Sequence, residues 1–210
     1  MGQGKSFHLT LGARDWEHPA WVAQFYPQDM PASWRLCFYA NEFSAVLVPA
    51  QRWQGTEVSD WRGWLGEVRE GFRFYLELAD PGGVDVEHLG RLRETLGPQL
   101  AGLVVPEAMR VPGEGGGYTP AMGPWPDGLP CYSASAPATH ARLWTGPDTQ
   151  APCGPVGRVV LPSGAHPRVL RDHLEAFARC SQGRSGVLFL DAPPAVMGQT
   201  VTLAGLLGFT

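Results

Sequence analysis

Arg14, Asp15 and His18 follow the first apolar segment of the chain, at the point where a strand would end. A guanidinium binds an anion through paired N–H donors, and a carboxylate or an imidazole can move a proton. These residues predict a small anionic ligand, with Arg14 as its binding residue and Asp15 and His18 as catalytic candidates. The simpler interpretation weighs more: Arg14 and Asp15 pair with each other or cap the next turn.

Further carboxylates stand at or just after predicted strands, at Glu77, Asp80, Glu107 and Asp191. Converging carboxylates can act as acid and base or hold Mg²⁺. Glu77 and Asp191 are the catalytic candidates of this group. Solvated loop charge is the simpler explanation, because carboxylates are common on protein surfaces. The sequence predicts neither a metal site nor a cofactor.

Aromatic residues crowd the same region, at Trp16, Trp21, Phe25 and Tyr26. Aromatic ring faces stack on sugars and bases, so Trp16, Trp21 and Tyr26 are candidate substrate-binding residues. The alternative is a hydrophobic core below a loop, and it is favoured because aromatic side chains dominate core burial.

The elements that would position these residues alternate at short intervals over the first hundred residues. Such alternation is typical of a parallel sheet with right-handed crossovers. Asp85 is expected to cap a helix that Gly97 ends. Strands are expected at 7–11, 45–48, 72–78 and 100–105, with helices that begin near Ser33 and Ser59.

Residues 106–157 are rich in glycine and proline and predict irregular structure, with short strands at 129–133 and 140–144. The C-terminal part predicts strands at 158–161 and 187–190 and helices after Pro167 and at 200–207. About seven strands result, one fewer than in a complete barrel. The predicted fold class is α/β, a TIM-barrel-like (β/α) barrel that is incomplete or distorted, in a single domain over residues 1–210.

Composition excludes several classes of function. The net charge is −4 with no basic stripe, which argues against nucleic acid, and no apolar run is long enough for a membrane span. Four widely spaced cysteines fit reduced thiols in a cytoplasmic protein rather than a zinc site. No signal peptide is expected. Lys5 is the single lysine, a bias typical of a GC-rich bacterial genome. The oligomeric state stays open.

The segment from Gly12 to Pro49 resembles the opening of the YecE-like family of TIM barrels (domain of unknown function 72). Weaker similarity continues in 71–78, 92–109 and 187–208, with deletions in the middle of the chain. The resemblance implies a barrel but no settled activity. Its matching residues are Gly12, Trp16, Trp21, Phe25, Tyr26, Pro27, Leu36, Tyr39, Ala40, Phe43 and Val46.

Departures from the family pattern bear on function. Leu47, Pro49 and Glu77 stand where the family carries Glu, Asn and Lys. In TIM barrels the polar residues at the carboxyl ends of strands carry the chemistry. The first hypothesis is therefore a non-catalytic or degenerate paralogue with a binding or structural role. The alternative is an enzyme acting on a small anionic or sugar-like substrate at the barrel mouth. A third hypothesis is an interaction module that uses exposed Trp125 and Trp144.

Overall fold

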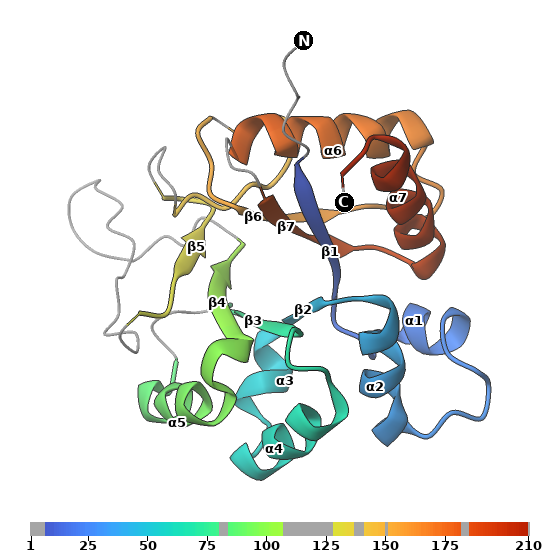
Figure 1. Cartoon of the computed structure of the whole chain (residues 1–210). Coiled ribbons are helices and arrows are strands. Elements are labelled where there is room, and N and C mark those ends of the chain that lie inside the picture. The colour runs from blue at the N-terminus through green and yellow to red at the C-terminus, as the bar shows by residue number, and fades with distance from the viewer. Residues whose placement is uncertain are drawn as a thin grey trace.

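A computed structural model of the chain describes residues 7–79, 84–106, 128–136, 141–149, 151–181 and 185–209. Within these ranges, seven strands form one curled sheet in the order β5-β4-β3-β2-β1-β7-β6, and every pairing is parallel (Figure 1). The predicted α/β class and incomplete barrel are thus confirmed. The strands are β1 (His8–Arg14), β2 (Ala45–Val48), β3 (Arg73–Glu77), β4 (Leu100–Val105), β5 (Cys131–Ser133), β6 (Val156–Val160) and β7 (Ser185–Asp191).

Helices cover the outer side of the sheet around most of its circumference (Figure 1). They are α1 (Pro19–Gln24), α2 (Ala32–Glu42), α3 (Ala50–Gln54), α4 (Val58–Glu67), α5 (Val86–Leu96), α6 (Pro167–Ser181) and α7 (Pro194–Leu206). Between β5 and β6, the described residues contain no helix. The stretch 106–157, predicted to be irregular, contains β5 and the first two residues of β6 among its described residues. Trp125 lies outside the described residues.

The gap in the ring between β5 and β6 is bridged by residues 141–144. Leu143 N–H donates to the Ser133 carbonyl on one side, and Trp144 N–H donates to the Val156 carbonyl on the other. Both bridges are parallel, so this segment takes the place of an eighth strand. Leu143 faces the interior and Trp144 the outer core, as successive strand residues do. Trp144 is therefore buried, which corrects the prediction that it is an exposed contact residue.

The interior of the ring is filled by side chains from alternate strand positions. Tyr75 and Phe189 meet edge-to-face across it, with ring centroids 5.0 Å apart, and Leu47, Val104 and Leu143 pack around them. Gly12 leaves room for this packing, because a Cβ there would lie 2.9 Å from the Phe189 ring. The interior below the mouth is thus a packed core rather than a channel.

Some helix starts differ from the sequence prediction. α2 follows Pro31 instead of a Ser33 cap, and α4 follows Glu57 instead of Ser59, with no side-chain cap in either helix. α7 begins at Pro194 rather than at residue 200, because a proline fits the first turn of a helix. The α5 prediction is confirmed, since the Asp85 side chain accepts a hydrogen bond from His88 N–H and Gly97 has a φ of 53°.

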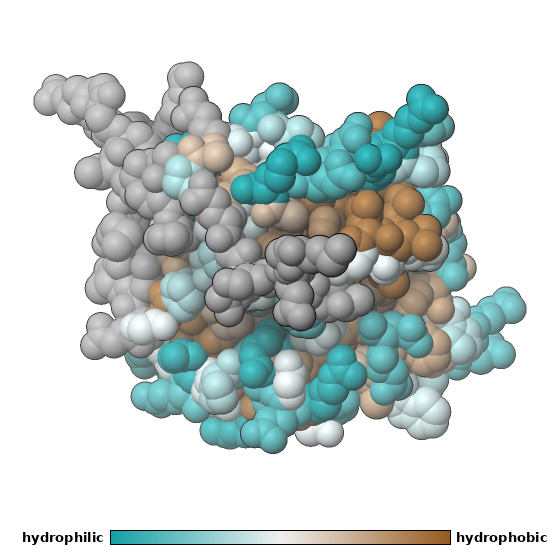
Figure 2. Space-filling view, turned by 45° about the horizontal axis from the view of Figure 1, so that its top comes forward, coloured by the Kyte–Doolittle hydropathy of each residue, from teal (hydrophilic) through white to brown (hydrophobic). Residues whose placement is uncertain are grey.

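Two adjacent C-terminal helices have very different outer faces. α6 is strongly amphipathic, and its exposed side carries Arg171, Glu175 and Arg179. α7 is apolar nearly all round and leaves Val201 and Leu206 exposed. Figure 2 shows this as brown atoms at the right beside the teal of α6. No helix in the described part of the chain is both long and apolar enough to span a membrane.

Candidate functional site

The carboxyl ends of the parallel strands bring four charged side chains together at the mouth of the ring. Arg14 ends β1, Glu77 ends β3, Asp191 ends β7, and Arg158 points inward from β6. Arg14 donates to both oxygens of Glu77, at 2.5 Å from Nε and 3.0 Å from Nη2. Arg158 Nη2 donates to Asp191 Oδ2 at 3.0 Å. We call these four residues the inner cluster.

The two pairs of the inner cluster also contact each other. Arg14 Nε lies 3.9 Å from Asp191, and Arg158 Nε lies 4.0 Å from Glu77. Glu77 is only 6% exposed, and the arginines offset the cost of burying its carboxylate. The hydrogen bonds from Arg14 to Glu77 raise the pKa of the Arg14 guanidinium further above its usual value, which keeps it cationic.

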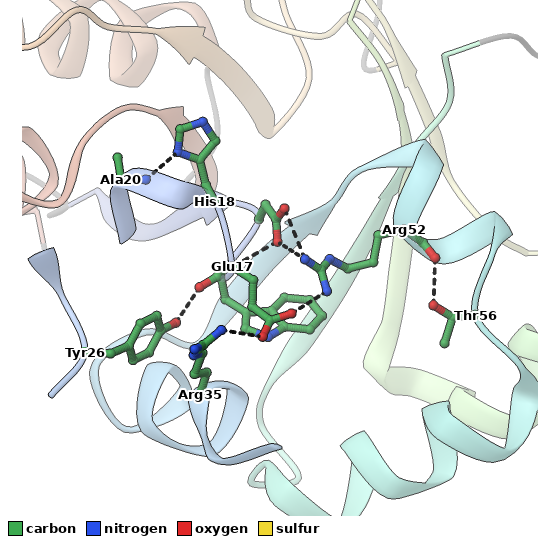
Figure 3. Close-up of polar contacts among 9 residues, drawn as sticks. Glu17, His18, Ala20, Tyr26, Arg35, Arg52 and Thr56 are labelled. Atoms are coloured by element: carbon green, nitrogen blue, oxygen red, sulfur yellow. Dashed lines mark hydrogen bonds and ion pairs between the residues drawn. The ribbon is translucent and has the colours of Figure 1, made fainter. Parts of the chain in front are cut away.

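A second set of ion pairs lies just outside the ring, and we call it the outer cluster. Arg52 of α3 donates to Glu17 at 2.6 Å and lies 3.2 Å from Asp15, while Arg35 of α2 lies 3.3 Å from Glu17. The Arg52 guanidinium also sits 4.8 Å from the centre of the Trp16 ring. Figure 3 shows these side chains converging from the two helices and the loop after β1.

The turn after β1 depends on Asp15, which has a φ of 64°. This left-handed conformation is uncommon for a residue other than glycine, although aspartate tolerates it better than most. The Asp15 carboxylate accepts a hydrogen bond from Glu17 N–H at 3.0 Å, and Asp15 N–H donates to the Leu47 carbonyl. The turn sends the Arg14 side chain into the ring and the Asp15 side chain away from it.

Two hollows flank Arg14 at the mouth. One, of about 240 Å³, is lined by Arg14, His18, Ser163 and Asp191, among others. The other, of about 430 Å³, is lined by Arg14, Asp15, Arg52 and Thr56, among others. His18 is exposed at the smaller hollow, and its Nδ1 accepts a hydrogen bond from Ala20 N–H at the start of α1 (Figure 3).

Some guanidinium N–H groups near the mouth are shielded from solvent without being paired. Arg52 Nε and Arg158 Nε have no hydrogen-bond partner among the described residues. The 4.0 Å from Arg158 Nε to Glu77 is too long for a hydrogen bond. Buried donors of this kind need an acceptor, because leaving a charged donor unpaired costs free energy.

The aromatic candidates hold the first βα unit together. Trp21 Nε1 donates to the Ala192 carbonyl, and the Tyr26 hydroxyl donates to the Trp16 carbonyl at 2.6 Å. All three side chains lie in the outer core, although Trp21 also lines the smaller hollow. Tyr39 joins them, since its hydroxyl accepts from Ala13 N–H and donates to the Ala45 carbonyl. A stacking role for the three candidates stays a prediction.

The structure brings Arg14, Glu77 and Asp191 together, and it places Asp15 and His18 beside them in different hollows. Sequence reasoning missed Arg158, whose signal was a charged residue inside an apolar strand. It also missed Glu17, Arg35 and Arg52, which have no local signal because they lie on separate elements. Asp80 and Glu107 lie outside the described residues. The described part of the chain contains no group of three or more histidine, cysteine, aspartate or glutamate side chains that could hold a metal ion.

Comparison with known proteins finds similarity to one family. Residues 10–80 match the family model described as "Protein of unknown function DUF72". A DUF72 family protein from Enterococcus faecalis V583 has a similar structure, with 14% identity, a TM-score of 0.58, and coverage of 99% of this chain and 100% of its own. One from Thermotoga maritima MSB8 has 10% identity, a TM-score of 0.57, and coverage of 95% and 99%. No curated protein matches the sequence.

Proposed function

We propose that the chain is a non-catalytic barrel, a divergent relative of the DUF72 proteins that it resembles, and that it binds a small anionic ligand at its mouth. The observation that carries this proposal is the position of Arg14, which borders both hollows, beside Arg52, which lines the larger hollow and whose shielded Nε lacks an acceptor in the described chain. A ligand with carboxylate, phosphoryl or hydroxyl oxygens would supply that acceptor.

The pairing of the carboxylates supports a binding role over acid–base chemistry. Both oxygens of Glu77 accept from Arg14, and Asp191 accepts from Arg158. Asp15 and Glu17 are likewise paired with Arg52. A general base needs an oxygen within reach of the substrate proton, and these contacts occupy the oxygens with arginine donors.

The size of the site limits the ligand. The hollows of about 240 and 430 Å³ lie on either side of Arg14; the first is smaller than the usual range for small-molecule sites and the second lies in its lower part. A molecule of a few carbons with one or two acidic groups would fit either hollow. Arg14 borders both, so its guanidinium is the contact that a ligand in either position would share.

Thermal unfolding with inorganic phosphate, malonate and glucose 6-phosphate tests the proposal. A ligand at a hundred times its dissociation constant adds about 2.7 kcal/mol to the free energy of unfolding. The informative variant is the double substitution R14M/E77M, because it removes the anion-binding group without leaving Glu77 buried and unpaired. We expect this variant to fold and to lose the stabilisation.

The matched control is Arg91→Ala on α5, which removes a guanidinium paired only with exposed Glu87. The control should keep the full stabilisation by the same probe. The proposal fails if no probe stabilises the wild-type protein, or if R14M/E77M binds the probe as tightly as the wild type does.

A second candidate function is an enzyme acting on a small anionic or sugar-like substrate. It is favoured by the smaller hollow, where His18 and Asp191 lie beside Arg14 and Ser163. In that case a bound probe would be chemically altered over time, and His18→Ala would abolish the change while leaving binding intact. An unaltered probe after prolonged incubation supports the non-catalytic barrel instead.

A further inference from the structure

A third hollow lies away from the mouth, between α2 and the end of α4. Its volume is about 470 Å³, within the usual range for small-molecule sites. It shares no lining residue with either hollow at the mouth. Its walls include Met30, Trp34, Cys37, Phe38, Asn41 and Glu67.

The hollow contains a carboxylate without an arginine. Glu67 Oε2 is shielded from solvent and has no hydrogen-bond partner among the residues that the structure describes. Burial raises the pKa of the Glu67 carboxyl group above its ordinary value. An ionised oxygen in this position costs free energy unless a donor reaches it, so the site is complementary to a cation.

The walls supply the surfaces that an organic cation prefers. The Trp34 side chain is 65% exposed although it is the largest apolar group of α2, and Phe38 lies one turn further along the same helix. Indole and phenyl faces attract a cation through the ring quadrupole. Met30 adds a flexible thioether, which adapts to ligands of different shape.

We propose that this hollow binds a small organic cation that carries an ammonium group on an apolar body. The ammonium group donates to Glu67, and the apolar body packs against Trp34, Phe38 and Met30. Asn41 offers a second polar contact at the rim. This site is independent of the anion site at the mouth.

Calorimetry with three phenylalkyl probes of similar size tests the proposal on the full chain. Phenethylammonium is the cation, 2-phenylethanol is its neutral counterpart, and 3-phenylpropionate is the anionic one. We expect phenethylammonium to bind at least tenfold more tightly than 2-phenylethanol and 3-phenylpropionate to bind least. Glu67→Gln should remove the preference, because the amide keeps the shape but not the charge.

Glu70→Gln is the matched control, since Glu70 is an exposed carboxylate three residues along the chain. It should leave the affinity for phenethylammonium unchanged. Trp34→Leu should weaken all three probes. Melting temperatures verify that each variant folds, and Glu67→Gln should melt no lower than the wild type because it removes an unpaired carboxylate.

Cys37 reports where the probe binds. It is exposed and lines the hollow, whereas Cys153 and Cys180 are buried and Cys131 is partly buried. Bound phenethylammonium should slow the reaction of Cys37 with a disulfide reagent severalfold, and 3-phenylpropionate at the same concentration should not.

Equal affinity for phenethylammonium and 2-phenylethanol would overturn the proposal, and so would a failure of phenethylammonium to bind at all. An equal loss of affinity in Glu67→Gln and Glu70→Gln would also overturn it, because it would reduce the effect to general surface charge. Binding without protection of Cys37 would place the cation elsewhere on the protein.

Discussion

The inner and outer ion-pair clusters contain the same residue types but differ in what holds them. The inner cluster joins the ends of β1, β3 and β7 to the middle of β6 across the interior of the ring, and Glu77 is almost fully buried there. The outer cluster joins a loop to the first turns of two helices, and none of its side chains is as buried as that of Glu77. The comparison teaches that a deeply buried carboxylate such as Glu77 depends on its arginine partner for stability, whereas the partly exposed carboxylates of the outer cluster can also be solvated by water.

The largest expected effect is that of breaking the inner cluster on one side. Arg14→Met leaves Glu77 buried with only the distant Arg158 Nε, so we expect a loss of about 3 kcal/mol in the free energy of unfolding. R14M/E77M should recover most of this loss, because no buried charge remains unpaired. Denaturant unfolding measures both, and equal stability of the single and double variants would contradict the structural role.

A smaller effect is expected from the outer cluster. Arg52→Ala removes two ion pairs and the contact with the Trp16 ring, and we expect a loss of about 1 kcal/mol. The loss should shrink as salt is added, since partly exposed pairs are screened. A loss as large as that of Arg14→Met, unaffected by salt, would remove the distinction between the clusters.

Glu67 extends the comparison to a half-buried carboxylate outside both clusters, one of whose oxygens is shielded from solvent. Its pKa is raised by burial, so the folded state holds the proton more tightly than the unfolded chain does. The stability of the wild type relative to Glu67→Gln should therefore fall as pH rises from the usual glutamate pKa through the raised one. Thermal melts of both proteins over the mildly acidic range measure this, and a difference that rises with pH would contradict it.

The smallest effect is expected from a fully solvated pair. Arg91→Ala on α5 removes an i,i+4 contact with Glu87, and we expect a change of about 0.3 kcal/mol. Denaturant unfolding of this variant and of Arg52→Ala under the same conditions measures both losses in the free energy of unfolding. A change above that of Arg52→Ala would show that exposure does not rank these ion pairs.

Local sequence signals predicted much of the fold. β4 was predicted at 100–105 and lies there, because a short apolar run after a glycine-ended helix is typical of a buried strand. The Asp85 cap and the Gly97 end of α5 were also predicted correctly, since both depend on hydrogen bonds and dihedral angles within a few residues. The similarity of residues 12–49 to the family agrees with the family match over 10–80.

The candidate site was predicted only in its parts. Glu77 and Asp191 were identified from their position after strands, but no sequence pattern indicated that Arg14 pairs with the first and Arg158 with the second. Those pairs join residues 63 and 33 positions apart. The curvature of the sheet brings Arg14 of β1 to Glu77 of β3 across β2, and the pairing of β6 with β7 brings Arg158 to Asp191.

The sequence by itself determined the alternation of strands and helices and the residue types at the strand ends, because these follow from local periodicity and turn chemistry. The tertiary structure alone decided that residues 141–144 bridge the ring and that Tyr39 joins β1 to β2. It also decided that Glu77 has an arginine partner and that the shielded oxygen of Glu67 has none among the described residues. These outcomes depend on which distant side chains share a buried space, and burial sets the free energy of every charge within it.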